Sequence, residues 1–382
     1  MNVEERPKIA IDAREMLDWA TGIGKYVHNL LDRLPELDPT IDYYFLRNGR
    51  PIDNFKTRTP NAQFVVSPEY ADDQWEQGFV PSFLQSHEID LFHSPRSGFV
   101  AFWPPGRPYV VTLHDLIPLL FPEKYSSEWI QRIRDRVPDY LARAEKIITV
   151  SYSVKKDVQS LIPVEEDKFQ VIHQGIEAHY GPVAEEVARP RLRERFKLEG
   201  NYIFYIGGFS FRKNVTGLVK AYSILPEHLR QGYRLVIGGY RTDDFDEVVR
   251  CVEELGLQER VLFTGRCSEV DIPCLYSGAA LFVYPSLYEG FGLPPLEAMA
   301  CRTPVITSDR GSLPEIAGKG ALMVNPCDHR QLSEAMARVL TDEGLRRALI
   351  EKGLAVVSQF SWDRNARETL EVYRAVLGKL RT

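Results

Sequence analysis

The sequence lacks any hydrophobic run that approaches the ~18 apolar residues of a membrane-spanning helix. Residues 1–8 are polar and charged and lead directly into an apolar segment, so the hydrophobic region of a secretory signal peptide is missing as well. Because both features are absent, we expect a protein that stays in the cytoplasm.

The sequence also has fewer basic than acidic residues, and it has few cysteines. The 382 residues include 47 Lys and Arg against 53 Asp and Glu, which gives a formal net charge of -6. Nucleic-acid binding through a broad basic surface needs clustered cations, so we exclude nucleic acid as a partner. The five cysteines are odd in number and form no C-x-x-C pair, which predicts reduced packing thiols rather than disulfides or a metal site.

Short apolar segments alternate with amphipathic ones along the whole chain, which is typical of parallel sheets built from β-α-β units. The expected strands form two series, and the length suits two domains, so two sheets are more natural than one. The first series is 8–12, 43–46, 63–66, 90–93, 109–114, 146–151 and 169–172; the second is 201–206, 234–238, 260–264, 280–285, 304–308 and 321–324.

The strand pattern lapses between residues 174 and 195, where turn residues and charges cluster. We therefore place a boundary near residue 180, between Rossmann-like α/β domains over 1–180 and 181–360 that face each other across a cleft. Residues 361–382 begin with Ser361, a good N-cap, and carry apolar residues at helical spacing. They predict a C-terminal helix that closes back on the N-terminal domain.

In open α/β sheets, ligands bind at loops that follow the carboxyl ends of strands. After the strand 201–206, Gly207 and Gly208 lead to Arg212 and Lys213. Small residues followed by two cations at a helix start suit a diphosphate, which Arg binds bidentately and Lys binds as a point charge. Without an anion these cations would oppose the helix dipole, which disfavours a purely structural role. No G-K-[ST] sequence occurs, so a Walker P-loop is excluded.

Two carboxylates, Glu289 and Glu297, follow the strand 280–285. Pro294 and Pro295 indicate a helix start, so Glu289 lies in the loop and we expect Glu297 in the first helical turn. Glu297 could serve only to complement the helix dipole, whereas Glu289, beside glycine and aromatic residues, has no comparable structural reason. Together the two carboxylates can accept hydrogen bonds from two sets of sugar hydroxyls in one pocket.

Gly22 and Gly24 precede a helical pattern, where helix N-terminal amides can bind a phosphate. The alternative is a flexible loop that caps the helix. Val27 breaks the dinucleotide-binding fingerprint, which argues against a dehydrogenase.

Two other loops follow strands. His114 and Asp115 stand at the end of the strand 109–114, where they would form either a hydrogen-bonded turn or part of a catalytic site. Arg96 follows the strand 90–93 and would meet an acceptor or lie in a solvated loop.

These motifs resemble the retaining glycosyltransferases of family 4, which have the GT-B fold, and especially bacterial polysaccharide mannosyltransferases. The strongest match is Glu289 and Glu297 in SLYEGFGLPPLEAMA, followed by TPVITSDRGSLPEIAG. Other segments look like family motifs in family order: IDAR at 11–14, TGIGKY at 21–26, HDLIP at 114–118, VIHQG at 171–175, RKN at 212–214 and FSW at 360–362. The resemblance covers essentially the whole chain.

The resemblance implies a role for each matching residue. Lys213 and Arg212 would hold the donor diphosphate, with Arg212 replacing an Arg that many members carry five or six residues before the Lys. Glu297 would bind the ribose, and His114 would lie beside the anomeric centre. The implied donor-binding residues are Gly22, Gly24, Gly208, Arg212, Lys213, Glu289, Gly290, Phe291, Gly292, Leu293 and Glu297. The implied catalytic residues are His114, Arg212, Lys213 and Glu289, and Arg96 and Asp115 would meet the acceptor.

The family's retaining reaction implies transfer on one face of the sugar, with the departing phosphate helping to deprotonate the acceptor. Cations and amides would stabilise the leaving diphosphate, so we expect neither a metal nor another cofactor. The acidic cluster at 243–246 is better explained as helix capping than as a metal site. A two-carboxylate glycosidase is not supported.

The resemblance favours GDP-mannose as the donor, with UDP-hexoses as the alternative, and a glycan or lipid-linked oligosaccharide as the acceptor. The basic segment 124–143 would rest on the inner face of an anionic membrane or form a solvated charged face. A sugar-nucleotide epimerase and a non-catalytic sugar-nucleotide sensor are the rival functions on the same fold.

Overall fold

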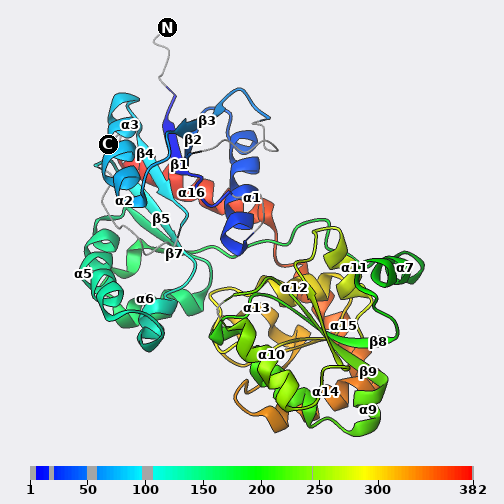
Figure 1. Ribbon diagram of the computed structural model, residues 1–382. Helices are drawn as coiled ribbons and strands as arrows, with labels where there is room; N and C mark the ends of the chain where they lie inside the picture. Colours follow the sequence, from blue (N-terminus) through cyan, green and yellow to red (C-terminus); the bar gives the residue numbers. More distant parts are fainter. Residues whose placement is uncertain (1–5, 17–20, 50–57, 97–105, 243, 381–382) are drawn as a thin grey trace. The chain divides into compact units, whose positions relative to one another are not determined.

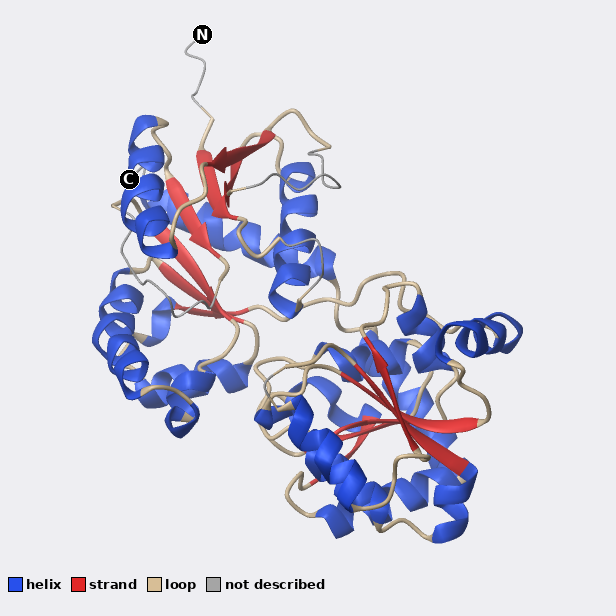
Figure 2. Cartoon of the chain, in the orientation of Figure 1, coloured by secondary structure: helices blue, strands red, loops and turns tan. Residues whose placement is uncertain are grey.

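The computed structural model describes residues 6–16, 21–49, 58–96, 106–242 and 244–380 (Figure 1). The chain forms two compact units: Met1–Gly175 together with Ser361–Thr382, and Ile176–Phe360. We call them unit 1 and unit 2. In each unit a parallel sheet is flanked by helices, so the predicted architecture of two parallel α/β domains is confirmed (Figure 2).

The sheet of unit 1 has seven strands in the order β3-β2-β1-β4-β5-β6-β7, all parallel. Its strands are β1 (Lys8–Asp12), β2 (Asp42–Asn48), β3 (Ala62–Ser67), β4 (Leu91–Ser94), β5 (Tyr109–Leu113), β6 (Lys146–Thr149) and β7 (Phe169–Val171).

The sheet of unit 2 has six strands in the order β10-β9-β8-β11-β12-β13, also parallel. Every strand expected from the sequence is present, with ends that shift by one or two residues. The strands are β8 (Asn201–Ile206), β9 (Tyr233–Gly238), β10 (Val261–Gly265), β11 (Leu281–Tyr284), β12 (Val305–Ser308) and β13 (Ala321–Val324).

The other regular elements of the described residues are helices and helical turns. In unit 1 they are α1 (Gly22–Leu37), α2 (Asp72–Gln74), η1 (Trp75–Phe79), α3 (Val80–Ser86), α4 (Ile117–Leu120), η2 (Pro122–Lys124), α5 (Ser127–Arg143), α6 (Tyr152–Leu161) and η3 (Glu166–Lys168), followed at the chain end by α16 (Trp362–Leu380). In unit 2 they are α7 (Glu185–Phe196), η4 (Phe211–Lys213), α8 (Val215–Ser223), α9 (Glu227–Gly232), α10 (Phe245–Glu254), α11 (Asp271–Ser277), α12 (Leu293–Ala300), α13 (Leu313–Ala317), η5 (Gly318–Gly320), α14 (His329–Thr341) and α15 (Glu343–Val357). No helix in these described ranges is long and apolar enough to cross a membrane.

Strand order reverses once in each sheet, and the reversal marks where a ligand can approach. In unit 1, β1 lies between β2 and β4; in unit 2, β8 lies between β9 and β11. Connections leave the two neighbouring strands in opposite directions at such a point, so their loops diverge and open a crevice at the carboxyl edge. The loops after β8 and β11 are therefore the expected ligand-binding loops of unit 2.

The C-terminal helix α16 belongs to unit 1, where it packs beside α1 (Figure 1). Its apolar face, which includes Leu370 and Tyr373, joins the same hydrophobic core as β1 and α1. At the helix surface, Arg374 Nη2 lies 2.7 Å from Asp38 Oδ2. Burial of a helix face, rather than an isolated surface ion pair, supplies most of the docking energy.

We expect Leu370→Ala to lower the free energy of unfolding of unit 1 by about 2 to 5 kcal/mol, because it leaves a cavity under α16. The neighbouring exposed residue provides the control: Glu371→Ala should change it by less than about 0.5 kcal/mol. Urea unfolding of both variants measures the difference. Equal stabilities would show that α16 is not part of the core.

Candidate active site

The residues predicted to bind a diphosphate lie at the reversal point of the sheet of unit 2. Arg212 and Lys213 are in η4, in the loop that follows β8, and Glu289 is in the loop that follows β11. The two strands are direct neighbours, with Leu281 opposite Ile203. The topology therefore brings two loops that are far apart in sequence to one edge of the sheet.

Glu289 forms ion pairs with both cations. Its Oε2 lies 2.8 Å from Arg212 Nη1, and its Oε1 lies 2.7 Å from Lys213 Nζ. The Tyr284 hydroxyl donates a hydrogen bond to Oε1 at 3.1 Å and also accepts one from Lys213 Nζ. Only 9% of the Glu289 side chain is exposed, against 12% for Lys213 and 23% for Arg212, so water does little to screen these charges.

The charges of the cluster determine the ionisation of Glu289. Burial raises the pKa of this carboxyl, but the positive charges of Arg212 and Lys213 outweigh burial and lower the pKa to about 2. Burial and the nearby Glu289 carboxylate raise the pKa of Tyr284 well above its usual value. At neutral pH the cluster thus contains a carboxylate, two cations and a protonated phenol.

The backbone fixes the two loops relative to each other. Asn214 adopts a left-handed conformation (φ 54°) and donates hydrogen bonds from Nδ2 to the carbonyl oxygens of Pro285 and Pro326. The Leu287 amide donates to the Arg212 carbonyl oxygen at 2.6 Å. These bonds tie the loop after β8 directly to the loop after β11, so the cation positions depend on both.

Ser312 and Gly311 hold the Glu289 loop from the other side. Ser312 Oγ donates to the carbonyl oxygens of Glu289 and Phe291. A Cβ at Gly311, where φ is +59°, would lie 2.9 Å from the Glu289 carbonyl oxygen, so a side chain cannot fit without moving the loop. The segment TSDRGSLPEIAG therefore positions the carboxylate through its backbone.

The helix α12 begins after Gly292, and this corrects the predicted place of Glu297. Gly292 is the N-cap residue with φ 110°, and α12 starts at Leu293, so no acidic residue stands in its first turn. Glu297 is one turn further on, where it is buried and accepts a hydrogen bond from the Tyr276 hydroxyl at 2.9 Å. Dipole complementation in a first turn therefore does not explain Glu297.

The remaining predicted donor-binding residues of unit 2 lie along these same loops. Gly208 follows β8, and its carbonyl oxygen accepts a hydrogen bond from the Tyr205 hydroxyl. Phe291 is buried and contacts Phe360 edge to face. The backbone that leads into the first turn of α12 is formed by Gly290, Phe291, Gly292 and Leu293. Amides at a helix N-terminus face outward without intrahelical acceptors, which suits an anion or a polar ligand.

The structure places His114 in unit 1, just after β5, with both ring nitrogens engaged. Nε2 contacts the Pro95 carbonyl oxygen at 2.9 Å, and Nδ1 contacts Gln174 Nε2 at 3.2 Å. A carbonyl can only accept and an amide nitrogen can only donate, which assigns the neutral tautomer with the proton on Nε2. Burial lowers the pKa of His114 to about 4, in agreement with a neutral ring.

The other predicted residues of unit 1 lie at the same carboxyl edge. Gly24 donates its amide to Thr21 Oγ1, and a Cβ there would lie 2.9 Å from the Glu15 carbonyl oxygen. Around Gly22, by contrast, a Cβ would meet open space. Arg96 pairs with Glu15 at 2.7 Å. Residues 97 and 98, which follow Arg96 in the same loop, lie outside the described residues.

Asp115 forms a side-chain turn just before the short helix α4, because its Oδ1 accepts a hydrogen bond from the Ile117 amide at 3.2 Å. Of the two alternatives left open for the pair at 114–115, the hydrogen-bonded turn is therefore present for Asp115.

Three partners of the site were not singled out from the sequence. Gln174 stands inside VIHQG and Tyr284 lies two residues before SLYEGFGLPPLEAMA, so these two motifs could have pointed to them. Tyr276 lies in α11, and nothing in its local sequence relates it to Glu297. Only the fold brings its hydroxyl to that carboxylate.

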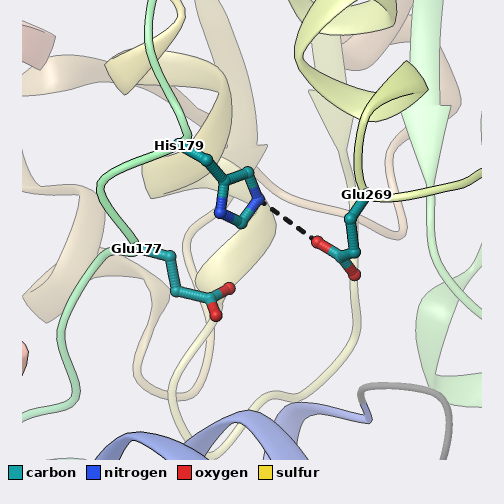
Figure 3. A group of neighbouring side chains, drawn as sticks. All are labelled: Glu177, His179 and Glu269. Carbon is teal, nitrogen blue, oxygen red and sulfur yellow. Dashed lines mark ion pairs between the residues drawn. The ribbon is translucent and has the colours of Figure 1, made fainter. Parts of the chain in front are cut away.

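One group of side chains in the described part of the chain has the spacing of possible metal ligands: Glu177, His179 and Glu269 (Figure 3). His179 Nε2 points at Glu269 Oε2, 3.2 Å away, and the two side chains are 41% and 48% exposed. Exposed pairs of this kind are common on protein surfaces without an ion. In the acidic cluster 243–246, Asp244 occupies the N-cap position of α10 but makes no side-chain cap bond, and Asp243 lies outside the described residues.

Comparisons with known proteins define the class. The model described as Glycosyltransferase Family 4 matches residues 20–180, and the model described as Glycosyl transferases group 1 matches residues 189–356. The solved sucrose-phosphate synthase of Thermosynechococcus elongatus has a TM-score of 0.79 and 25% identity, covering 98% of this chain and 100% of that one. The fold is GT-B, and the protein is a glycosyltransferase.

Two curated relatives are more specific. The O-antigen chain mannosyltransferase B of Escherichia coli is 32% identical over 351 residues, which are 91% of this chain and 88% of that protein. The serotype-specific mannosyltransferase WbdA of Escherichia coli is 33% identical over 274 residues, but the match spans only 33% of its length. The chain therefore belongs to the family of glycosyltransferases that carry these group 1 and family 4 domains.

Because His93 and His114 are buried, we expect the folded protein to lose stability in mild acid. Burial lowers the pKa of His93 to about 3 and that of His114 to about 4, whereas an unfolded histidine titrates near 6.5. Below pH 6.5 the unfolded chain takes up protons that the folded chain does not. The stability that each neutral, buried histidine contributes is therefore complete above pH 6.5 and is lost as the pH falls towards 4 and 3. Lowering the pH from 7 to 5 should reduce the free energy of unfolding by about 1 to 2 kcal/mol for each of these histidines.

Urea unfolding at the two pH values tests this expectation. His93→Gln should reduce the difference between pH 7 and pH 5, whereas His228→Gln, at an exposed position, should leave it unchanged. If all three proteins lose the same free energy, the buried histidines are not the cause.

Proposed function

We propose that this glycosyltransferase moves mannose from GDP-mannose to a glycan or lipid-linked oligosaccharide with retention of configuration, in the synthesis of a polysaccharide. The observation that carries the proposal is the cluster of Arg212, Lys213 and Glu289 at the reversal point of the sheet of unit 2. The names of the relatives, an O-antigen chain mannosyltransferase and a serotype-specific mannosyltransferase, support mannose. A UDP-hexose is the alternative donor.

The proposed task of the cations is to stabilise the leaving diphosphate. Negative charge on the diphosphate increases as its bond to the sugar breaks, so a fixed positive charge lowers the barrier. The chain that carries Arg212 and Lys213 is already fixed to the neighbouring loop by hydrogen bonds of the Arg212 carbonyl oxygen and of the Asn214 side chain. Little reorganisation is then needed during the reaction. Amides at the start of α12 add partial positive charge.

The protonation state of His114 supports transfer without a protein base. Its Nδ1 lone pair accepts from Gln174, and its pKa of about 4 makes it a weak base at neutral pH. We therefore propose that the departing phosphate, rather than His114, takes the proton of the acceptor hydroxyl. His114 would then act as a neutral polar group beside the sugar.

We propose that no divalent metal is needed and that no other cofactor takes part, because two cations and backbone amides supply the positive charge that a metal would supply. The acceptor would use unit 1, where Arg96 and Asp115 lie at the carboxyl edge of the sheet. A lipid-linked acceptor would bring the protein to the inner face of the membrane, and the exposed arginines of α5 are the matching surface.

The test is a transfer assay with GDP-mannose, UDP-glucose and UDP-galactose, each with an oligosaccharide acceptor in the presence of EDTA. We expect transfer from GDP-mannose at an undiminished rate, with the α-configuration of the donor preserved in the product by NMR. Loss of activity in EDTA with recovery in Mg²⁺ or Mn²⁺ would contradict the metal-free proposal. Release of a rearranged free sugar would indicate an epimerase, and binding without turnover would indicate a sensor.

Glu297 provides a second test, because its proposed ligand is the ribose. Glu297→Ala should weaken the binding of GDP by about 1.5 to 3 kcal/mol, the range for a hydrogen bond to a charged group. Inorganic pyrophosphate has no ribose, so its affinity should not change. Isothermal titration calorimetry with both ligands measures the two values. An equal loss for GDP and pyrophosphate would show that the substitution disturbs the whole site rather than a ribose contact.

A further inference from the structure

We propose that Glu289 is the internal counter-ion of the diphosphate site and thereby makes the site select an intact nucleotide-sugar over a free diphosphate. The inference rests on the proposed function for the nature of the ligand. It assigns to Glu289 a competitive role towards the diphosphate, in addition to contact with the donor sugar.

The geometry shows the competition directly. Each carboxylate oxygen of Glu289 is used by a different cation, Oε2 by Arg212 and Oε1 by Lys213. The carboxylate is buried, so its attraction to the cations is weakly screened. An arriving diphosphate must bind to cations whose positive charge is already half neutralised by Glu289. The net charge of the three groups is one positive charge, compared with two in the absence of the carboxylate.

The magnitude of this competition is considerable. Two unit charges about 6 Å apart interact by roughly 3 kcal/mol at an effective dielectric constant of about 20. The Glu289 carboxylate opposes every negative charge that a diphosphate brings to Arg212 and Lys213. Removing the carboxylate charge should therefore tighten diphosphate binding by at least about tenfold, which is only half of that pairwise energy.

An intact donor differs from a free diphosphate because it brings hydroxyl groups. When the cations turn towards a diphosphate, Glu289 loses part of its pairing and remains a buried charge, which is costly. The hydroxyls of a sugar can donate hydrogen bonds to the carboxylate and offset that cost. Free diphosphate cannot. The Glu289 carboxylate thus weakens the binding of the free diphosphate product more than the binding of the intact donor. When the carboxylate pairs again with Arg212 and Lys213, it favours release of the product.

The probe is inorganic pyrophosphate, which reports on the cations without a nucleoside or a sugar. We expect Glu289→Gln to bind pyrophosphate at least about tenfold more tightly than the wild type in calorimetry at low salt. The gain should shrink at high salt, since it is electrostatic. Glu289→Asp keeps the charge and should stay closer to the wild type than Glu289→Gln does.

Matched controls separate charge removal from general loosening. Glu297→Gln removes another buried carboxylate, which lies in the helix that follows the Glu289 loop and accepts a hydrogen bond from Tyr276. Its affinity for pyrophosphate should stay within about twofold of the wild-type value. Lys213→Ala removes a cation and should weaken pyrophosphate. Glu289→Ala is measured as a second variant without the charge. If one variant is less stable, the rise in its melting temperature on adding pyrophosphate ranks the affinities.

The outcomes distinguish this inference from the proposed function. If pyrophosphate binds the wild type and Glu289→Gln equally, or binds the variant more weakly, the counter-ion role is wrong while the diphosphate site stands. If it binds neither protein, the loops do not form an anion site and the proposed function fails. A further measurement addresses selectivity: the ratio of GDP-mannose to GDP affinity should fall at least about fivefold in Glu289→Gln, and an unchanged ratio would overturn the role in selection.

Discussion

The arrangement of the loops after β8 and β11 in unit 2 depends on the pairing of three buried or half-buried charges. A buried carboxylate that loses its partner lowers the stability of a protein by about 3 to 5 kcal/mol. Glu289 therefore depends on its ion pairs with Arg212 and Lys213, which are the same cations that a diphosphate would bind. The loops after β8 and β11 can stay together at the sheet edge because the ion pairs and the bonds of Asn214 connect them. The proposed diphosphate site is therefore held in shape by a carboxylate of the protein itself.

Unit 1 uses the same principle at its own reversal point. Arg14 follows β1 and pairs with Asp12 and Glu76 at 2.7 Å each, while its guanidinium lies 3.9 Å from the centre of the Trp75 ring. Burial lowers the pKa of Arg14, but the carboxylates outweigh burial and raise it above its usual value. In both units the loops at the carboxyl edge are fixed by ion pairs between buried or half-buried side chains, because loops lack the regular hydrogen bonds of the sheet.

The sequence predicted the sheets well and the contacts of the site only in part. The positions of the strands follow from alternating apolar and amphipathic segments, since each parallel strand is buried on both faces. Arg212, Lys213 and Glu289 were found because they follow strands. That Glu289 would neutralise the two cations was not predicted, because strands β8 and β11 are neighbours only through the sheet order. The expected first-turn place of Glu297 was wrong, since α12 begins at Leu293, one residue before Pro294, and has no acidic residue in its first turn.

His114 shows how a residue can be correctly located while its chemistry depends on distant partners. Its Nδ1 partner, Gln174, precedes Gly175, the last residue of unit 1 before the chain passes into unit 2. A Cβ on Gly175 would lie 2.1 Å from the Trp362 amide nitrogen, where the chain has just returned, so these two backbone segments are in close contact within unit 1. Trp362 and His114 both pack against Tyr26. The tautomer of His114 is thus set beside the two segments through which the chain leaves and re-enters unit 1, whereas burial keeps the ring neutral.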